Sequence, residues 1–206
     1  MNYLKDATVE WKNYFDDIKD YFSVLENKSV IEVGPWFGYH TEIFQEFKPL
    51  SLTLVEPDID NYLGLVNKFN GQDISIINDD IFTYLPENKK KVDVVTLLGV
   101  LYHFHSPLHL LELVVNYLNP EILFLDYPET RYNDEEGVLV RNEPNERSYY
   151  RGRKDFKIIH KSILFNYVSI IDGMSDLGYK VTLNLKPKNS YDYCKTMMLF
   201  YKFEKI

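Results

Sequence analysis

The chain has 206 residues, a formal net charge of −8 and a sequence pI near 5.2. Its 45% hydrophobic and 16% aromatic content is that of a folded protein with a full core, which excludes an intrinsically disordered chain. The acidic balance argues against a nucleic-acid binder that uses its whole surface, the single Cys194 excludes intrachain disulfides, and the lack of a membrane-length apolar run or a signal peptide predicts a cytoplasmic protein with no membrane partner.

The first half of the chain alternates between helical and extended patterns. Apolar residues at helical spacing predict an amphipathic opening helix over 9–26. Four strands are then predicted at 29–34, 51–58, 73–79 and 90–99, with helices at 38–48 and 59–69. The nearly continuous apolar run within 90–99 indicates a strand that is buried on both faces.

The second half continues with a helix over 107–118, which has Pro107 in its first turn, and a strand over 121–127. Residues 128–160 are polar and charged, and a helix is predicted to resume over 162–177. The last two strands, 179–185 and 195–203, have only a short loop between them, so they must pair as an antiparallel hairpin.

Strands that alternate with helices predict an α/β fold with a mainly parallel sheet. We expect one Rossmann-like domain of seven strands over residues 1–206, closed by the C-terminal antiparallel hairpin. Within it, residues 1–28 form an N-terminal helical cap and residues 128–160 form an insertion or lid.

The turn after the first strand carries two glycines, Gly34 and Gly38, with the bulky Trp36 and Phe37 between them. A dinucleotide loop needs G-x-G-x-x-G so that its backbone can approach a pyrophosphate. The G-x-x-x-G turn is too encumbered for that, but it can border a cofactor without phosphates. The alternative is a plain turn between a strand and a helix.

Acidic residues end the next strands of the predicted sheet. Glu56 lies at the end of the second strand, where a carboxylate can accept both ribose hydroxyls of a nucleoside. Asp79 or Asp80 follows the third strand and can accept the adenine amine, while Ile81 packs on the ring. Glu32 is inside the first strand, where burial requires a partner, and it either holds the loop or meets an ammonium group. An acidic ring of this kind suits S-adenosylmethionine (SAM), a cation without phosphates.

The four motifs occur in a fixed order, namely Glu32-x-Gly34-x-x-x-Gly38, Glu56, Asp80-Ile81 and VDVVTLLGVLYH over 92–103. This series resembles that of class I SAM-dependent methyltransferases over about residues 29–126 and the final hairpin. The resemblance implies SAM as the cofactor. Trp36 departs from the family, which has a glycine at that position.

The segment GVLYHFHSPLHLLELV, residues 99–114, is similar to a subgroup typified by bacterial tRNA wobble-uridine carboxymethyltransferases. That resemblance implies that Gly99 and Tyr102 line the sulfonium end of the cofactor. The subgroup binds a carboxylated cofactor through a long N-terminal extension. Only about 28 residues precede the first strand here, so ordinary SAM is expected.

His103 is predicted to face the acceptor beside Tyr102, where a neutral imidazole can remove a proton from a hydroxyl or amine. The alternative is a hydrogen bond to backbone. His103, His105 and His109 resemble a metal cluster, but a helix that begins at Pro107 turns His109 away, so no metal is predicted.

All five arginines lie within 23 consecutive residues, from Arg131 to Arg153. Because the guanidinium fork binds carboxylates and phosphates in a bidentate manner, Arg147, Arg151 and Arg153 are predicted to bind an anionic acceptor. A phosphorylated or carboxylated small molecule is the first choice and an RNA loop the second. The alternative is a loop in which the arginines pair with neighbouring glutamates.

The predicted function is therefore methyl transfer from SAM to an oxygen or nitrogen of a small, anionic acceptor. Two alternatives remain open. One is a SAM-binding protein with a regulatory role and no catalysis, and the other is a tRNA-modifying methyl- or carboxymethyltransferase. A nicotinamide (NAD) oxidoreductase is disfavoured, because the turn lacks the third glycine of a dinucleotide loop.

Overall fold

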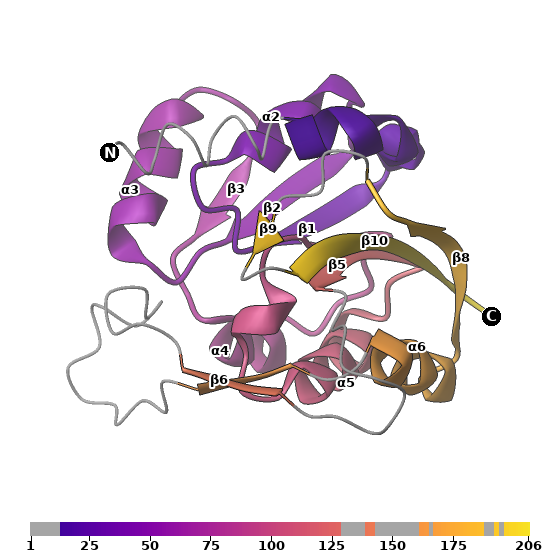
Figure 1. The fold of residues 1–206 in the computed structure, drawn as a ribbon. Coiled ribbons are helices and arrows are strands. Elements are labelled where there is room, and N and C mark those ends of the chain that lie inside the picture. Colours follow the sequence, from indigo (N-terminus) through magenta and orange to yellow (C-terminus); the bar gives the residue numbers. More distant parts are fainter. Residues whose placement is uncertain (1–12, 129–138, 143–160, 165–166, 188–191, 194–195) are drawn as a thin grey trace.

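The computed structural model describes residues 13–128, 139–142, 161–164, 167–187, 192–193 and 196–206 (Figure 1). Residues 13–18 are helical and continue into the 3-10 helix η1 (Lys19–Leu25). The elements that follow are β1 (Ser29–Val33), α2 (Tyr39–Glu46), β2 (Ser51–Val55), α3 (Ile59–Lys68), β3 (Ser75–Ile77), α4 (Ile81–Glu87), β4 (Val94–Leu97), η2 (Leu101–His103), α5 (Pro107–Leu118), β5 (Ile122–Pro128), β6 (Leu139–Asn142), β7 (Lys161–Leu164), α6 (Tyr167–Asp176), β8 (Tyr179–Leu185), β9 (Asp192–Tyr193) and β10 (Thr196–Lys205).

The main sheet has the strand order β3-β2-β1-β4-β5-β10-β8, and the short β9 pairs with β10. The first five strands in this order are parallel, whereas β10 runs antiparallel to both β5 and β8. The predicted Rossmann-like sheet with a closing antiparallel hairpin is therefore confirmed. β10, the last strand of the chain, lies between β5 and β8, so β8 forms one edge of the sheet.

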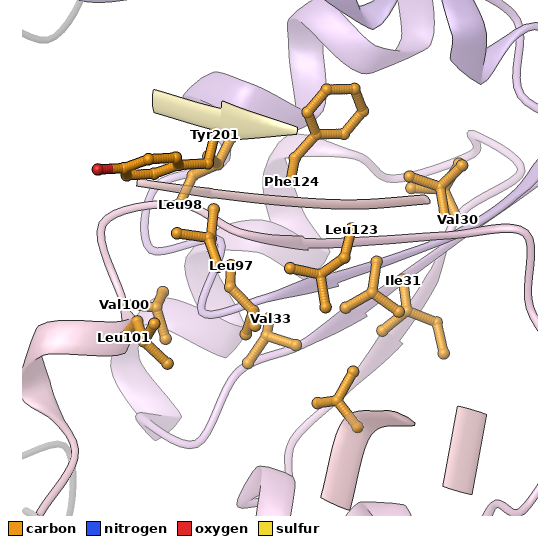
Figure 2. Packing of buried hydrophobic residues seen from close by; sticks show 14 of the residues in the cluster. Val30, Ile31, Val33, Leu97, Leu98, Val100, Leu101, Leu123, Phe124 and Tyr201 are labelled. Atoms are coloured by element: carbon orange, nitrogen blue, oxygen red, sulfur yellow. The ribbon is translucent and has the colours of Figure 1, made fainter. Parts of the chain in front are cut away.

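Helices cover both faces of the sheet (Figure 1), with the N-terminal helix, α2 and α3 on one face and α4, α5 and α6 on the other. Four of the five β1 residues and all four β4 residues are buried, as expected for parallel strands between two helical layers. In Figure 2 the neighbours Leu123 and Phe124 on β5 point to opposite faces. The sheet thus carries one core on each side.

The N-terminal helical segment is anchored in one of these cores by aromatic rings. Phe22 of η1 lies 5.1 Å from Phe124 and 5.7 Å from Phe200, measured between ring centroids, and it also contacts Phe44 of α2. Phe22 is fully buried. The described part of the predicted N-terminal cap is therefore built into the core beside β5 and β10.

The structure differs from the predicted elements most clearly at α4 and β7, and it adds the short elements η2, β6 and β9. No helix was predicted between the third and fourth strands, yet α4 forms there because the Asp80 side chain caps it by accepting the N–H of Phe82 (2.8 Å). The helix predicted over 162–177 is divided, with β7 at Lys161–Leu164 and α6 at Tyr167–Asp176. β7 pairs antiparallel with β6 (Leu139–Asn142), a partner inside the segment where no element was predicted.

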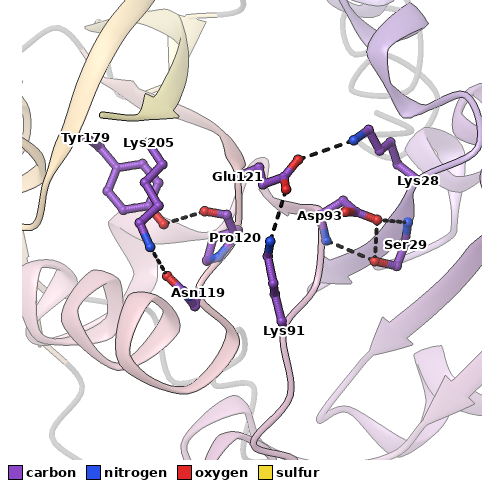
Figure 3. A network of polar contacts seen from close by, with 9 residues as sticks. All are labelled: Lys28, Ser29, Lys91, Asp93, Asn119, Pro120, Glu121, Tyr179 and Lys205. Atoms are coloured by element: carbon purple, nitrogen blue, oxygen red, sulfur yellow. Dashed lines mark hydrogen bonds and ion pairs between the residues drawn. The ribbon is translucent and has the colours of Figure 1, made fainter.

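The amino ends of the parallel strands are joined by polar contacts (Figure 3). The Asp93 carboxylate accepts hydrogen bonds from the N–H and the hydroxyl of Ser29, both at 2.7 Å. Glu121 pairs with Lys28 (3.2 Å) and Lys91 (3.1 Å). These contacts join the amino ends of β1, β4 and β5. A ligand of such a sheet binds at the opposite, carboxyl ends of the strands. Within the described residues, no helix has both the length and the apolar composition needed to cross a membrane.

Candidate functional site

The turn between β1 and α2 contains two glycines in the left-handed region. Gly34 (φ 65°) donates its N–H to the Val55 carbonyl (2.9 Å), and Gly38 (φ 72°) immediately precedes α2. A Cβ on Gly34 would lie 2.7 Å from Cγ2 of Val100, and one on Gly38 would lie 2.6 Å from Cε2 of Phe69. Both conformation and packing therefore require glycine at these positions.

Trp36, at the position where the resembling family has glycine, is also left-handed, with φ 52°. This conformation is uncommon for a residue with a side chain and costs about 1–3 kcal/mol. The Trp36 N–H donates to Oε2 of Glu56 (3.1 Å), and its ring lies 4.3 Å from that of Phe37. The loop thus keeps a backbone path that suits glycine, and Glu56 helps to hold it.

Glu56 follows β2 and is fully buried. Its Oε1 accepts the N–H of Asp58 (3.0 Å) and lies 3.5 Å from the Asn61 amide, while its Oε2 accepts the N–H of Trp36. Burial raises the pKa of Glu56 to about 7, against the opposing effect of these hydrogen bonds. A carboxyl group that titrates near neutral pH and touches the glycine loop is a strong candidate for a ligand contact.

Glu32 lies within β1 and is 1% exposed. Its Oε2 accepts the hydroxyl of Thr41 (2.7 Å), and its Oε1 lies 3.3 Å from Nδ1 of His40. Both partners are in the first turn of α2. Of the two roles considered for Glu32, the structure places it where it holds the loop and the helix that follows. His40 thus contacts Glu32 in the first turn of α2.

The acidic pair after β3 divides into two different environments. Asp80 is 7% exposed and caps α4. Asp79 is half-buried and accepts the N–H of Asp80 (2.8 Å). Ile81 is buried in the first turn of α4. Asp80 and Ile81, but not Asp79, line the cavity described below.

The turn after β4 is held by a residue that the sequence analysis missed. Gly99 (φ 70°) donates its N–H to Oδ1 of Asp126 on β5 (2.7 Å), and Oδ2 of the same carboxylate accepts the hydroxyl of Tyr14 (3.2 Å). Asp126 is fully buried. A charged residue between the apolar LFL and Tyr127 of a predicted strand was the available signal, because a buried charge requires partners.

Tyr102 and His103 form part of η2, which follows this turn. Tyr102 is 1% exposed and packs against the His103 ring with 4.5 Å between ring centroids. His103 is partly exposed and lines the cavity, which Tyr102 does not. The structure therefore places Tyr102 behind His103 in the core. His109 lies on α5, where its Nδ1 is 3.2 Å from Oε2 of Glu112.

A cavity of about 50 Å³ joins these motifs at the carboxyl ends of the parallel strands. Its lining residues come from the glycine turn, the ends of β1 and β2, the start of α4 and the segment after β4; they are Val33, Gly34, Val55, Pro57, Asp80, Ile81, Val100, His103 and Phe104. Small-molecule sites usually measure ~300–1,000 Å³. The cavity is smaller than such sites, and its apolar lining with the Asp80 carboxylate suits part of a nucleoside.

The predicted acceptor residues Arg147, Arg151 and Arg153 lie outside the described residues. Within the predicted insertion, the structure describes β6 (Leu139–Asn142), which includes the arginine at position 141. β6 pairs with β7, and β7 contacts η2. The described part of the insertion is thus attached to the element that carries His103.

A family model for a methyltransferase domain matches residues 7–168. The tRNA U34 carboxymethyltransferase of Nautilia profundicola is 32% identical over 115 residues, which cover 54% of this chain and 38% of that protein. The enzyme of the same name from Campylobacter concisus is 32% identical over 133 residues, covering 62% and 44%. The chain thus spans less than half the length of these curated relatives.

Among solved structures, the N-terminal domain of EvdMO1, in the presence of S-adenosylhomocysteine (SAH) and D-fucose, has a TM-score of 0.69 at 14% identity and covers 94% of this chain and 83% of that one. The comparisons confirm the predicted fold and methyltransferase family, and they support SAM as the cofactor. Since the domain match spans more than three quarters of the residues and includes every motif of the cavity, the chain belongs to the methyltransferase domain family.

Proposed function

We propose that the protein transfers a methyl group from SAM to an oxygen or nitrogen atom of a small, anionic acceptor. The observation that carries this proposal is the buried Glu56 carboxylate, which lies at the end of β2 and hydrogen-bonds the glycine turn at the Trp36 N–H. Ligands of open α/β sheets bind at this edge, beside the first strand.

The order of the strands supports one orientation of the cofactor along the carboxyl ends of the strands. Glu56 accepts the ribose hydroxyls after β2, while Asp80 and Ile81 hold the adenine after β3. The sulfur then lies toward β4, where Val100 and His103 line the cavity. Asp79 has a supporting role, because it accepts the N–H of Asp80 and so orients the residue that caps α4.

The reaction forms a bond between the acceptor atom and the methyl carbon while the bond from that carbon to sulfur breaks. The electron pair remains on sulfur and gives SAH, and the proton of the acceptor passes to the His103 imidazole. Tyr102, packed behind that ring, positions it. Alignment of the reactants can supply a large share of the rate enhancement, and a base adds about 10²–10⁴-fold.

Two measurements test this function. Calorimetric titration is expected to show binding of SAM and SAH and much weaker binding of NAD. Incubation with SAM and a pool of small metabolites is expected to produce SAH. Tighter binding of NAD, or binding of SAM without turnover in any acceptor pool, would contradict the proposal, and the second result would favour the regulatory alternative.

The anionic acceptor is supported by the cluster of arginines in the insertion. Changing Arg151 and Arg153 to Lys keeps the charge but removes the bidentate fork, so the acceptor KM is expected to rise while SAM affinity stays constant. The matched control changes Arg131 and Arg141 to Lys, and it is expected to leave the acceptor KM constant. Equal effects of both double substitutions would contradict a specific role for Arg151 and Arg153.

A second candidate is modification of tRNA, which is favoured by the names of the relatives at 32% identity. Under this reading the arginines meet phosphates of an RNA loop. The acceptor assay therefore includes total tRNA beside the metabolite pool, with and without ribonuclease. If a labelled methyl group is transferred to the tRNA fraction and ribonuclease abolishes this signal, the acceptor is RNA and not a small molecule.

A further inference from the structure

The turn between β1 and α2 has three residues in the left-handed region, namely Gly34, Trp36 and Gly38. Glu56 binds the middle of this turn at the Trp36 N–H. The end of the turn has a different neighbour, because a Cβ on Gly38 would lie 2.6 Å from Cε2 of Phe69, which directly follows α3. The C-terminal end of α3 therefore packs against the point where the turn becomes α2.

Lys68, the last residue of α3, extends its ammonium group to the same point. Its Nζ donates to the carbonyl of Phe37 (2.9 Å) and to that of Gly38 (3.4 Å). It also pairs with Oε2 of Glu42 on α2 (3.1 Å). A lysine ammonium has three N–H donors, so these three acceptors can use all of them.

Two aromatic rings also contact the ammonium of Lys68. Nζ lies 5.0 Å from the ring centroid of Tyr39 and 5.4 Å from that of Phe69, which is within the range of cation–π contacts. The Lys68 side chain is 30% exposed, so water screens these contacts only in part. This set of contacts joins the end of α3 to the turn and to the first turn of α2.

Lys68 can act on a bound cofactor only through the turn. Gly34 of the turn lines the cavity, whereas Lys68 does not. The turn needs support from outside, because Trp36 has a positive φ of 52°, a conformation that is unfavourable for a residue with a side chain. A site whose binding conformation is only partly populated loses affinity in proportion to that fraction.

We propose that Lys68 is a positioning residue that keeps the turn between β1 and α2 in the conformation that binds the cofactor. The proposal rests on the proposed function, since it takes SAM as the ligand of this turn. Without the ammonium, the carbonyls of Phe37 and Gly38 lose their cationic donor, and ligand binding must first restore the turn. Because Lys68 acts on the turn and not on the ligand, the affinities for SAM and SAH are expected to fall by the same factor.

The first test observes the turn itself. The chain has two tryptophans, Trp11 and Trp36, so Trp11→Phe leaves Trp36 as the single fluorescent reporter. In this background without ligand, Lys68→Met is expected to raise the constant for quenching of Trp36 fluorescence by acrylamide, and saturating SAH is expected to reverse the increase. An unchanged quenching constant would overturn the proposal.

The second test measures the dissociation constants of SAM and SAH by calorimetry. Lys68→Met keeps the apolar stem and removes the ammonium, so both affinities are expected to fall about five- to tenfold, with the turnover rate at saturating SAM unchanged. Lys68→Gln repeats the test without adding an exposed apolar group. Lys68→Arg keeps a cationic donor and is expected to stay within about threefold of wild type. Equal losses in Lys68→Arg and Lys68→Met, different factors for SAM and SAH, or a lower rate with unchanged affinity would overturn the proposal.

Two controls separate the turn from the general effect of a lost charge. Lys28→Met removes a lysine of similar exposure (37%) that pairs with Glu121 at the amino ends of the strands, and it is expected to leave both affinities and the quenching constant unchanged. Glu42→Gln removes only the ion pair of Lys68 with α2 and is expected to change the affinities less than about twofold.

Equal losses in Glu42→Gln and Lys68→Met would assign the effect to the ion pair and not to the turn carbonyls, and would overturn the proposal. A wild-type protein that binds neither SAM nor SAH would refute the proposed function. The quenching of Trp36 without ligand would still decide whether Lys68 holds the turn, so the two failures can be distinguished.

Discussion

Glu56 makes a pH-dependent prediction that can be worked out from the structure. Its pKa of about 7 in the free protein means that about one tenth of the molecules carry the carboxylate at pH 6 and about nine tenths at pH 8. Ribose hydroxyls donate to the ionised form, so the affinity for the cofactor is expected to be about tenfold weaker at pH 6 than at pH 8. This difference corresponds to about 1.4 kcal/mol.

The assay is calorimetric titration with SAH at several pH values, because SAH has the same ribose as SAM and no charge on sulfur. Glu56→Gln is expected to bind more weakly at pH 8, by about 1.5–3 kcal/mol for a lost hydrogen bond to a charged group, and to show no pH dependence. Glutamine keeps one acceptor oxygen, so it retains the hydrogen bond to only one of the N–H groups of Trp36 and Asp58, which bind different oxygens of Glu56. A wild-type affinity that is constant from pH 6 to 8, or an equal pH dependence in the variant, would refute the reasoning.

Three further predictions concern the stability and the chemistry of the site. The folded pKa of Glu56 lies above its usual 4.5, so its contribution to stability is present below pH 4.5 and is lost as the pH rises to about 7. In denaturant unfolding without cofactor, the free energy of unfolding of wild type relative to Glu56→Gln is therefore expected to fall by about 3 kcal/mol across that range. A difference that stays constant would contradict the burial of the charge. Gly38→Ala places a Cβ 2.6 Å from Phe69 at φ 72°, so it is expected to lower the free energy of unfolding by about 1–3 kcal/mol, whereas Gly71→Ala, which meets no atom within 4 Å at φ 77°, reports the backbone cost alone. His103→Ala is expected to lower the methylation rate about 10²-fold or more with SAM affinity unchanged, while Tyr102→Phe changes that rate less; an equal loss of SAM affinity in both variants would show that the pair only shapes the cofactor pocket.

The sequence was sufficient to predict most of the sheet and of the cofactor edge. Hydrophobic periodicity reports burial, so β4 could be recognised as a strand with two buried faces before its neighbours were known. Gly34, Gly38 and Glu56 were predictable because each lies at the end of a strand or at the start of a helix, where a turn conformation or a polar contact restricts the residue type. Of the predicted site residues, Gly34, Asp80, Ile81 and His103 line the cavity, and their roles toward a cofactor or acceptor stay predictions.

Other features depend on contacts between residues that are distant in the chain. β7 was predicted as the start of a helix because its pairing with β6, about 20 residues earlier, leaves no periodic signal. Tyr102 was predicted to face a ligand, but it is 1% exposed, since packing decides which side of a short 3-10 helix is covered. Trp36 shows the same limit, because its positive φ is stabilised by contacts outside its own segment.

By itself, the sequence determined most of the strands and helices of the main sheet, the places where glycine is required and the acidic character of the cofactor edge, because these depend on local conformation and on the period of burial. Only the tertiary structure decided that β10 lies between β5 and β8, that Glu56 is buried deeply enough to titrate near neutral pH, and that Asp126 joins Tyr14 to the Gly99 turn. Those features arise when residues as far apart as 14 and 126 are brought together, and the field around a buried charge is set by such neighbours.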